Sequence, residues 1–188
     1  MIFILGMRGT GTTPVWCFLN SHPSVKNLEF EPHELSFVLE VSHIGRYKNH
    51  SFVKTTMEEW SRGKYGGAKI AYNPGQISLR WRWIPEAFPD SKFIFVMRNE
   101  KDGYDSLVSK DRDKIYGVPS WEQYISYRQY LLDSFMLYYR RNPTTSILLD
   151  YDRMLLKPDE EFKGVWSTLG LPWKSIANQI QLPRHRSG

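Results

Sequence analysis

A short apolar run that passes directly into a glycine-rich loop constrains the fold of this chain most. Residues 2–5 are Ile-Phe-Ile-Leu, which all favour β-structure, and the stretch from Gly6 to Thr13 contains three glycines. Pro14 follows, a residue suited to the first turn of a helix. This succession predicts a strand, a tight loop and a helix.

Further apolar runs indicate more strands. They fall at residues 68–72, 92–97 and 146–149. The run at 92–97 is apolar after Lys92 and too short for a helix, which is typical of a strand buried in a parallel sheet. Helical patterns separate the runs: Ser120 and Gln123 form a capping-box signature, after which aromatic and apolar residues recur at helical spacing. Strands that alternate with helices predict an α/β three-layer sandwich with a mostly parallel central sheet.

Length and composition exclude several classes of protein. With 188 residues, 41% of them hydrophobic, the chain fits one domain spanning 1–188. No apolar run approaches the roughly 20 residues of a membrane-spanning helix, and no signal peptide is recognisable, so we expect a cytoplasmic protein without a membrane partner. Cys17 is the single cysteine, and we expect it in the core. The net charge of +5 favours an anionic ligand but no nucleic-acid partner.

The glycine loop is nearly the phosphate-binding loop of kinases and nucleotide hydrolases. Four residues separate Gly6 from Gly11. Thr13 stands where that loop has serine or threonine, but Thr12 replaces its lysine, the cation on which phosphoryl transfer relies. Backbone amides, a helix start and the hydroxyls of Thr10, Thr12 and Thr13 suit an anion such as a 5′-phosphate. The alternative is a strand-to-helix turn without a ligand.

A second candidate anion site follows the run at 92–97. Arg98 stands at the strand exit, and Ser106 comes eight residues later, about two helical turns. If Asn99 caps a helix here, both side chains border a groove beside the glycine loop and can bind a phosphate. A nucleotide hydrolase tends to place an aspartate at such a strand end to organise magnesium. The pattern therefore predicts a ligand with two separate phosphates and no metal.

Both motifs resemble those of the sulfotransferases that use 3′-phosphoadenosine 5′-phosphosulfate (PAPS). Thr-Gly-Thr-Thr at residues 10–13 is similar to that family's 5′-phosphosulfate loop. Arg98 and Ser106, preceded by Phe-Pro-Asp-Ser-Lys-Phe-Ile at 88–94, are similar to its 3′-phosphate motif in type and spacing. Further similarity at residues 22–25, 148–152 and 169–172 extends the resemblance over nearly the whole chain. It implies a P-loop NTPase-like sulfotransferase fold, nearest to the bacterial and carbohydrate-type members.

The resemblance also implies roles for individual residues. PAPS would donate its sulfuryl group, without a metal, to a hydroxyl or amine of a small-molecule or saccharide acceptor. The 5′ end would be held by Arg8, Gly9, Thr10, Gly11, Thr12 and Thr13, and the 3′-phosphate by Arg98 and Ser106. Glu31 best matches the base that takes the acceptor proton, with His33 as the alternative if the register differs. The alternative to a catalytic role is that Glu29, Glu31 and Glu34 form a solvent-exposed face.

The chain departs from the family at several cationic positions. Gly9 replaces the basic residue that normally precedes the threonine, so the nearest cation is Arg8. Lys69 is a second candidate for stabilising the leaving phosphate, and Lys54 is a weaker third. Glu100 stands where many members have proline. The changes at Gly9 and around Lys69 keep open the alternative of a non-catalytic nucleotide-binding relative. A P-loop small-molecule kinase is a further alternative, which the missing lysine disfavours. The sequence predicts no oligomeric state.

Overall fold

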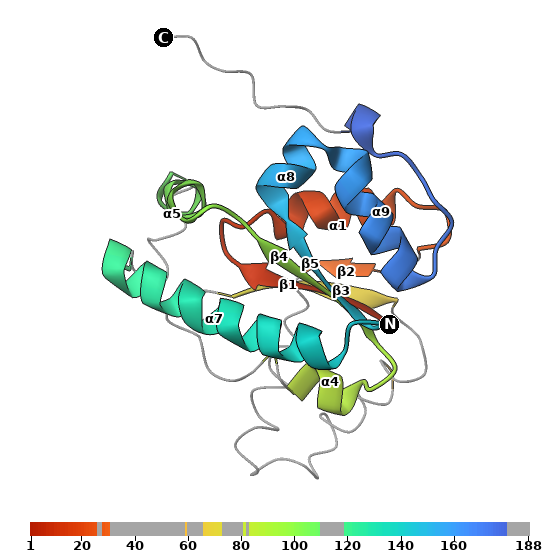
Figure 1. Cartoon of the computed structure of the whole chain (residues 1–188), viewed down its shortest axis with the longest axis horizontal. Coiled ribbons are helices and arrows are strands. Elements are labelled where there is room, and N and C mark those ends of the chain that lie inside the picture. The colour runs from red at the N-terminus through yellow and green to blue at the C-terminus, as the bar shows by residue number, and fades with distance from the viewer. Residues whose placement is uncertain are drawn as a thin grey trace.

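A parallel sheet lies at the centre of the fold (Figure 1). The computed structural model describes residues 1–25, 28–30, 59, 66–72, 81, 83–109 and 119–179. Within these residues the strands are β1 (Ile2–Met7), β2 (Leu28–Phe30), β3 (Gly67–Tyr72), β4 (Lys92–Met97) and β5 (Ser146–Asp150). They form a five-stranded sheet in the order β2-β3-β1-β4-β5, and every neighbouring pair is parallel. The predicted α/β class and the predicted parallel strands are confirmed.

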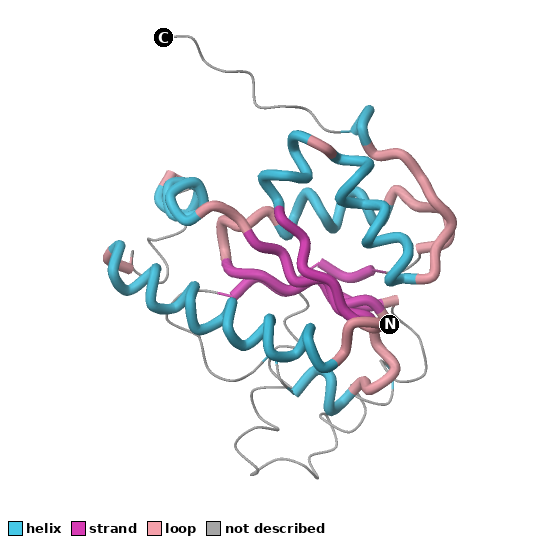
Figure 2. The backbone as a smooth tube through the Cα atoms, in the orientation of Figure 1, coloured by secondary structure: helices cyan, strands magenta, loops and turns pink. Residues whose placement is uncertain are grey.

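Helices cover both faces of the sheet and complete the three layers (Figure 2). On one face lie α1 (Thr12–Asn20), α8 (Tyr151–Leu156) and α9 (Pro158–Leu169), and on the other lie α4 (Trp83–Ala87) and α7 (Trp121–Arg141). α5 (Glu100–Val108) lies beyond the carboxyl end of β4, and a 3₁₀ turn (Ala177–Gln179) follows α9. None of the described helices combines the length and apolar character needed to cross a membrane.

Alternate side chains of the strands build a separate core on each face of the sheet. Phe3, Phe93 and Phe95 belong to the core under α7, whereas Ile4 belongs to the core under α1 and α9. The Phe95 ring stacks on Phe135 of α7 with centroids 4.3 Å apart. Because successive residues of a strand point to opposite faces, continuous apolar runs satisfy both cores at once.

The long helices begin at the residues that the sequence indicates. Ser120 and Gln123 form the predicted capping box of α7: each side chain accepts a hydrogen bond from the other residue's backbone amide. Asn99 caps α5, and its side chain accepts hydrogen bonds from the backbone amides of Lys101 and Asp102. Capping satisfies amides that have no partner within the helix, so α5 starts at Glu100, two residues after Arg98.

The expectation that Cys17 lies in the core is wrong. Its thiol is exposed on α1. This short helix instead turns Val15, Phe18 and Leu19 toward the sheet. These three residues belong to the buried face of α1, and Cys17 lies outside that face.

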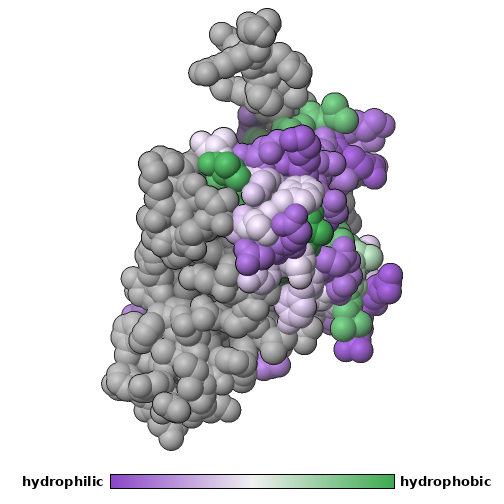
Figure 3. Space-filling view, turned by 90° about the vertical axis from the view of Figure 1, so that its left-hand side faces the viewer, coloured by the Kyte–Doolittle hydropathy of each residue, from purple (hydrophilic) through white to green (hydrophobic). Residues whose placement is uncertain are grey.

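The surface carries scattered hydrophobic residues. Figure 3 shows one face of the molecule, on which the hydrophobic residues of the described part form separate areas among hydrophilic ones. The large exposed apolar side chains come from different elements: Val108, Trp121, Leu137, Leu156 and Trp173 are among them. Single exposed apolar side chains of this kind are normal for a folded protein.

The strand order brings two loops together at one point of the sheet. β1 lies between β3 and β4; the chain continues from β1 to β2 and β3 on one side, and from β4 to β5 on the other. Ligands of open parallel sheets bind at the carboxyl ends of strands where the order reverses in this way. The glycine loop follows β1 and Arg98 follows β4, so both predicted anion sites lie at this crevice.

Candidate anion-binding site

A cavity opens at this crevice. Its lining consists of Arg8, Gly9, Gly11, Thr12, Thr13, Pro14, Lys69, Ala71, Arg98, Ser106 and Tyr151. The glycine loop and α1, β3, the exit of β4, α5 and the start of α8 all contribute to it. Every residue expected to bind the donor lines the cavity except Thr10, and so does Lys69. The structure therefore brings both predicted anion sites to one cavity.

The glycine loop presents its helix start to this cavity without a side-chain cap. Gly11, the residue before α1, has a φ of 97° and provides no side-chain hydrogen bond to the first amides of the helix. Thr10 closes the loop instead, because its hydroxyl and its amide both donate to the Met7 carbonyl oxygen, at 2.7 and 3.2 Å. The first amides of α1, which have no side-chain cap, and the positive end of the helix dipole form an arrangement that favours an anion.

Close backbone contact explains why residue 9 is glycine. Gly9 has a φ of 89°, and a Cβ there would lie 2.3 Å from the Gly103 carbonyl oxygen of α5. A Cβ on Gly11 would lie 2.2 Å from the Tyr151 ring. The loop is thus pressed against α5 on one side and against the start of α8 on the other. A basic side chain at position 9 would clash with α5, so a cation beside this loop can come only from another position.

Lys69 places such a cation beside the loop. It lies within β3, with 2% of its surface exposed, and its Nζ donates to the Thr13 hydroxyl at 3.1 Å. β3 is parallel to β1, and its Lys69 is in register with Ile4, so the long side chain runs toward the loop that follows β1. Because Thr13 accepts this bond, its own O–H can donate into the cavity.

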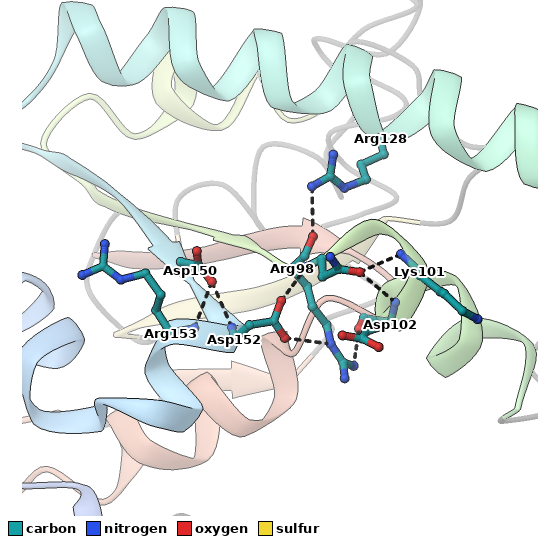
Figure 4. Close-up of polar contacts among 9 residues, drawn as sticks. Arg98, Lys101, Asp102, Arg128, Asp150, Asp152 and Arg153 are labelled. Atoms are coloured by element: carbon teal, nitrogen blue, oxygen red, sulfur yellow. Dashed lines mark hydrogen bonds and ion pairs between the residues drawn. The ribbon is translucent and has the colours of Figure 1, made fainter.

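Arg98 is held at the cavity by several groups (Figure 4). Its Nη1 donates to the Gly9 carbonyl oxygen at 3.2 Å, and its Nε lies 3.5 Å from Asp152 Oδ1. The guanidinium carbon is 5.2 Å from the centre of the Tyr151 ring. Ser106 lines the same cavity from α5. A guanidinium fixed in this way retains donors for a phosphate, and the serine hydroxyl adds another.

Gly103, Tyr151 and Asp152 take part in this geometry although the sequence motifs assign them no role. Asp152 Oδ2 accepts from the Asn99 amide at 2.6 Å, in addition to its ion pair with Arg98. Burial raises the pKa of the Tyr151 phenol, against the opposing effect of Arg98, so the phenol stays neutral. Tyr151 and Asp152 come two and three residues after the end of the strand predicted at 146–149, and this position is the sequence signal that places them near the crevice.

The proposed base and one proposed cation lie outside the described residues. β2 ends at Phe30, and the structure describes neither Glu31 nor the alternative base His33. The same holds for Lys54. Within the described part of the chain, no three His, Cys, Asp or Glu side chains come close enough to hold a metal ion.

Comparison with known proteins gives matches only at the level of structure. No protein-family model matches the sequence, and no curated protein matches it. The solved sulfotransferase domain from the curacin biosynthetic pathway is similar over 100% of this chain and 80% of its own, with 16% identity and a TM-score of 0.71.

Two further solved structures show the same likeness. A sulfotransferase from Alicyclobacillus acidocaldarius is similar over 97% of this chain and 86% of its own, with 13% identity and a TM-score of 0.59. The sulfotransferase domain of the Synechococcus PCC 7002 olefin synthase is similar over 97% and 80%, with 14% identity and a TM-score of 0.58. The parallel sheet, the loop after β1 and these likenesses show that this chain has the P-loop-like fold of sulfotransferase domains.

Proposed function

We propose that this protein is a sulfotransferase that moves a sulfuryl group from PAPS to a hydroxyl or amine acceptor. One observation carries the proposal: a single cavity joins an uncapped glycine loop to Arg98 and Ser106. A ligand with a phosphate at each end of a nucleoside would engage both. The fold, which sulfotransferase domains share, is consistent with this ligand.

The loop side of the cavity suits the 5′-phosphosulfate. Amides at the start of α1 and the hydroxyls of Thr12 and Thr13 can donate to its oxygens. Lys69, buried beside Thr13, supplies the positive charge that the loop itself lacks at Gly9. Arg8 also lines the cavity and adds a second cation.

The α5 side suits the 3′-phosphate. Arg98 is aimed by Gly9, Tyr151 and Asp152, and its remaining donors together with the Ser106 hydroxyl can bind a phosphate. An ATP molecule has no phosphate at that position, so this pair would discriminate between the two nucleotides.

Transfer would proceed in line. An acceptor oxygen or nitrogen forms a bond to sulfur while the bond from sulfur to the bridging oxygen breaks, and the electron pair stays on the 5′-phosphate. Lys69 and Arg8 stabilise the charge that grows there. Glu31 takes the acceptor proton. The products are a sulfated small molecule or saccharide and adenosine 3′,5′-bisphosphate, and no step requires a metal.

Calorimetric titration tests the donor site. Purified protein in EDTA is titrated with adenosine 3′,5′-bisphosphate, and separately, without EDTA, with ATP plus magnesium. The proposal expects metal-free binding of the bisphosphate and much weaker binding of ATP. Preference for magnesium ATP would instead support a small-molecule kinase. Tight bisphosphate binding without turnover of PAPS on any acceptor tested would support a non-catalytic relative.

A further inference from the structure

The peptide group that follows Arg98 is held from two opposite sides. Its carbonyl oxygen accepts a hydrogen bond from Nη2 of Arg128 on α7, at 2.9 Å. Its N–H, which belongs to Asn99, donates to Asp152 at 2.6 Å. Figure 4 shows Arg128 reaching this carbonyl from α7 while Asp152 lies on the other side. Because the C=O and N–H of a trans peptide point in opposite directions, the two partners fix its plane.

Arg128 also compensates a negative charge near the site. Its Nη1 lies 2.9 Å from Glu100 Oε1, and the Arg128 side chain is 14% exposed against 51% for Glu100. Glu100 is two residues from Arg98 in the chain. An uncompensated carboxylate there would repel a phosphate bound by Arg98, and the ion pair with Arg128 offsets that repulsion.

The helix that carries Arg128 is anchored one turn earlier. Tyr124 is fully buried, and burial raises the pKa of its phenol to about 12. A Cβ on Gly103 would lie 2.3 Å from the Tyr124 hydroxyl oxygen, so α7 meets the backbone of α5 closely at this point. Arg128, four residues later, therefore extends from a well-packed part of α7.

We propose that Arg128 is a positioning residue for the 3′-phosphate site. It orients the Arg98–Asn99 peptide so that the Arg98 guanidinium faces the cavity, and it keeps Glu100 from opposing the phosphate. This inference rests on the proposed function, because the 3′-phosphate of the nucleotide is the group whose binding Arg128 would improve.

The test compares two nucleotides that differ only in the 3′-phosphate. Wild-type protein and Arg128→Met are titrated with adenosine 3′,5′-bisphosphate and with adenosine 5′-phosphate. The substitution should weaken bisphosphate binding by ~10-fold, because it removes the hydrogen bond to the Arg98 carbonyl oxygen and leaves the charge of Glu100 without its partner. Adenosine 5′-phosphate binding should change less than ~2-fold, because this nucleotide has no 3′-phosphate for Arg98 to bind. Arg140→Met, about three turns further along α7, is the matched control and should change neither affinity.

Two more variants separate positioning from general damage. Adding Glu100→Gln to Arg128→Met should recover part of the bisphosphate affinity, because the uncompensated carboxylate is removed. Arg128→Lys keeps the charge but loses the planar guanidinium, which binds the Arg98 carbonyl and Glu100 at the same time. It should therefore lower the preference for the bisphosphate over adenosine 5′-phosphate by a smaller factor than Arg128→Met does, in a protein that remains folded.

The nucleotide preferences of the variants and of the wild-type protein test two different assignments. The preference for adenosine 3′,5′-bisphosphate is its affinity divided by that of adenosine 5′-phosphate. If this preference is the same in Arg128→Met and Arg128→Lys as in wild type, the positioning role is overturned, whether both affinities are unchanged or both fall equally. If wild-type protein itself does not prefer the bisphosphate over adenosine 5′-phosphate, the proposed donor site fails instead.

Discussion

A lysine with 2% of its surface exposed is costly to keep in a parallel strand, which makes Lys69 the residue whose removal separates stability from function. Lys69→Met preserves the length and apolar stem of the side chain. The substitution removes the desolvation cost of a buried charge but also the hydrogen bond to Thr13, so we expect the free energy of unfolding to change by no more than ~2 kcal/mol.

Activity should respond to the same substitution far more strongly. If Lys69 stabilises charge on the leaving phosphate, Lys69→Met should lower PAPS-dependent turnover by at least ~100-fold. Denaturant titration and an initial-rate assay measure the two quantities. Lys92→Met, at the amino end of β4, is the control and should retain activity. Turnover within a few-fold of wild type in Lys69→Met would contradict the assignment.

The contact between Gly9 and Gly103 is testable by adding a single methyl group. Gly9→Ala meets both a left-handed backbone and a carbonyl oxygen 2.3 Å away, so we expect it to destabilise the fold by about 3 kcal/mol. Gly170, with a φ of 67° and nothing within 4 Å of its hypothetical Cβ, isolates the backbone contribution. Gly170→Ala should therefore cost only about 1 kcal/mol. Equal losses in chemical unfolding would show that the loop can move away from α5.

At the scale of elements, Asp159 ties the start of α9 to the segment that follows it. Its carboxylate accepts hydrogen bonds from the Ser175 hydroxyl and from the amides of Ile176 and Ala177. The Ser175 hydrogen bond contributes most to holding the Asp159 pKa below its usual value of 3.8. A carboxyl group with a depressed pKa in the folded state stabilises the protein above its unfolded pKa, and that stability is lost as the pH falls.

Acid unfolding checks this link. In Asp159→Asn, the free energy of unfolding should depend less on pH between about pH 5 and pH 2 than in wild type, because one titrating group is removed. Ser175→Ala removes the hydroxyl that donates to Asp159. It should also reduce the pH dependence of the free energy of unfolding in acid, by a smaller amount. An unchanged slope in Asp159→Asn would show that the segment is held by other contacts.

Elements with local signals could be predicted from the sequence, and contacts between distant elements could not. β4 and the capping box of α7 are encoded in runs of a few residues, which is why their positions agree with the structure. The geometry around Arg98 instead depends on Gly9, 89 residues away, and the amide of Asn99 depends on Asp152, 53 residues away. Motifs therefore located Arg98 and Ser106, while the residues that hold Arg98 required the folded arrangement.

At the scale of the whole molecule, the candidate site joins segments from both ends of the described chain. The residues that line the cavity range from Arg8 to Tyr151 in the sequence. They include the residues that follow β1 and β4, two neighbouring strands whose side chains contribute to both cores. A nucleotide bound there would contact the loop after β1, α5 and the start of α8 at once. Its binding energy should consequently stabilise the fold as one cooperative unit.

Ligand-linked unfolding measures this coupling. At a concentration of adenosine 3′,5′-bisphosphate 100 times its dissociation constant, and with EDTA present, the free energy of unfolding should rise by ~2.7 kcal/mol. Arg98→Ala should lose most of this increment because the 3′-phosphate loses its charged partner. The rise should be the same whether unfolding is followed by far-ultraviolet circular dichroism or by tryptophan fluorescence. A rise seen by one probe alone would mean that the nucleotide stabilises only part of the chain, which would contradict a site built across both cores.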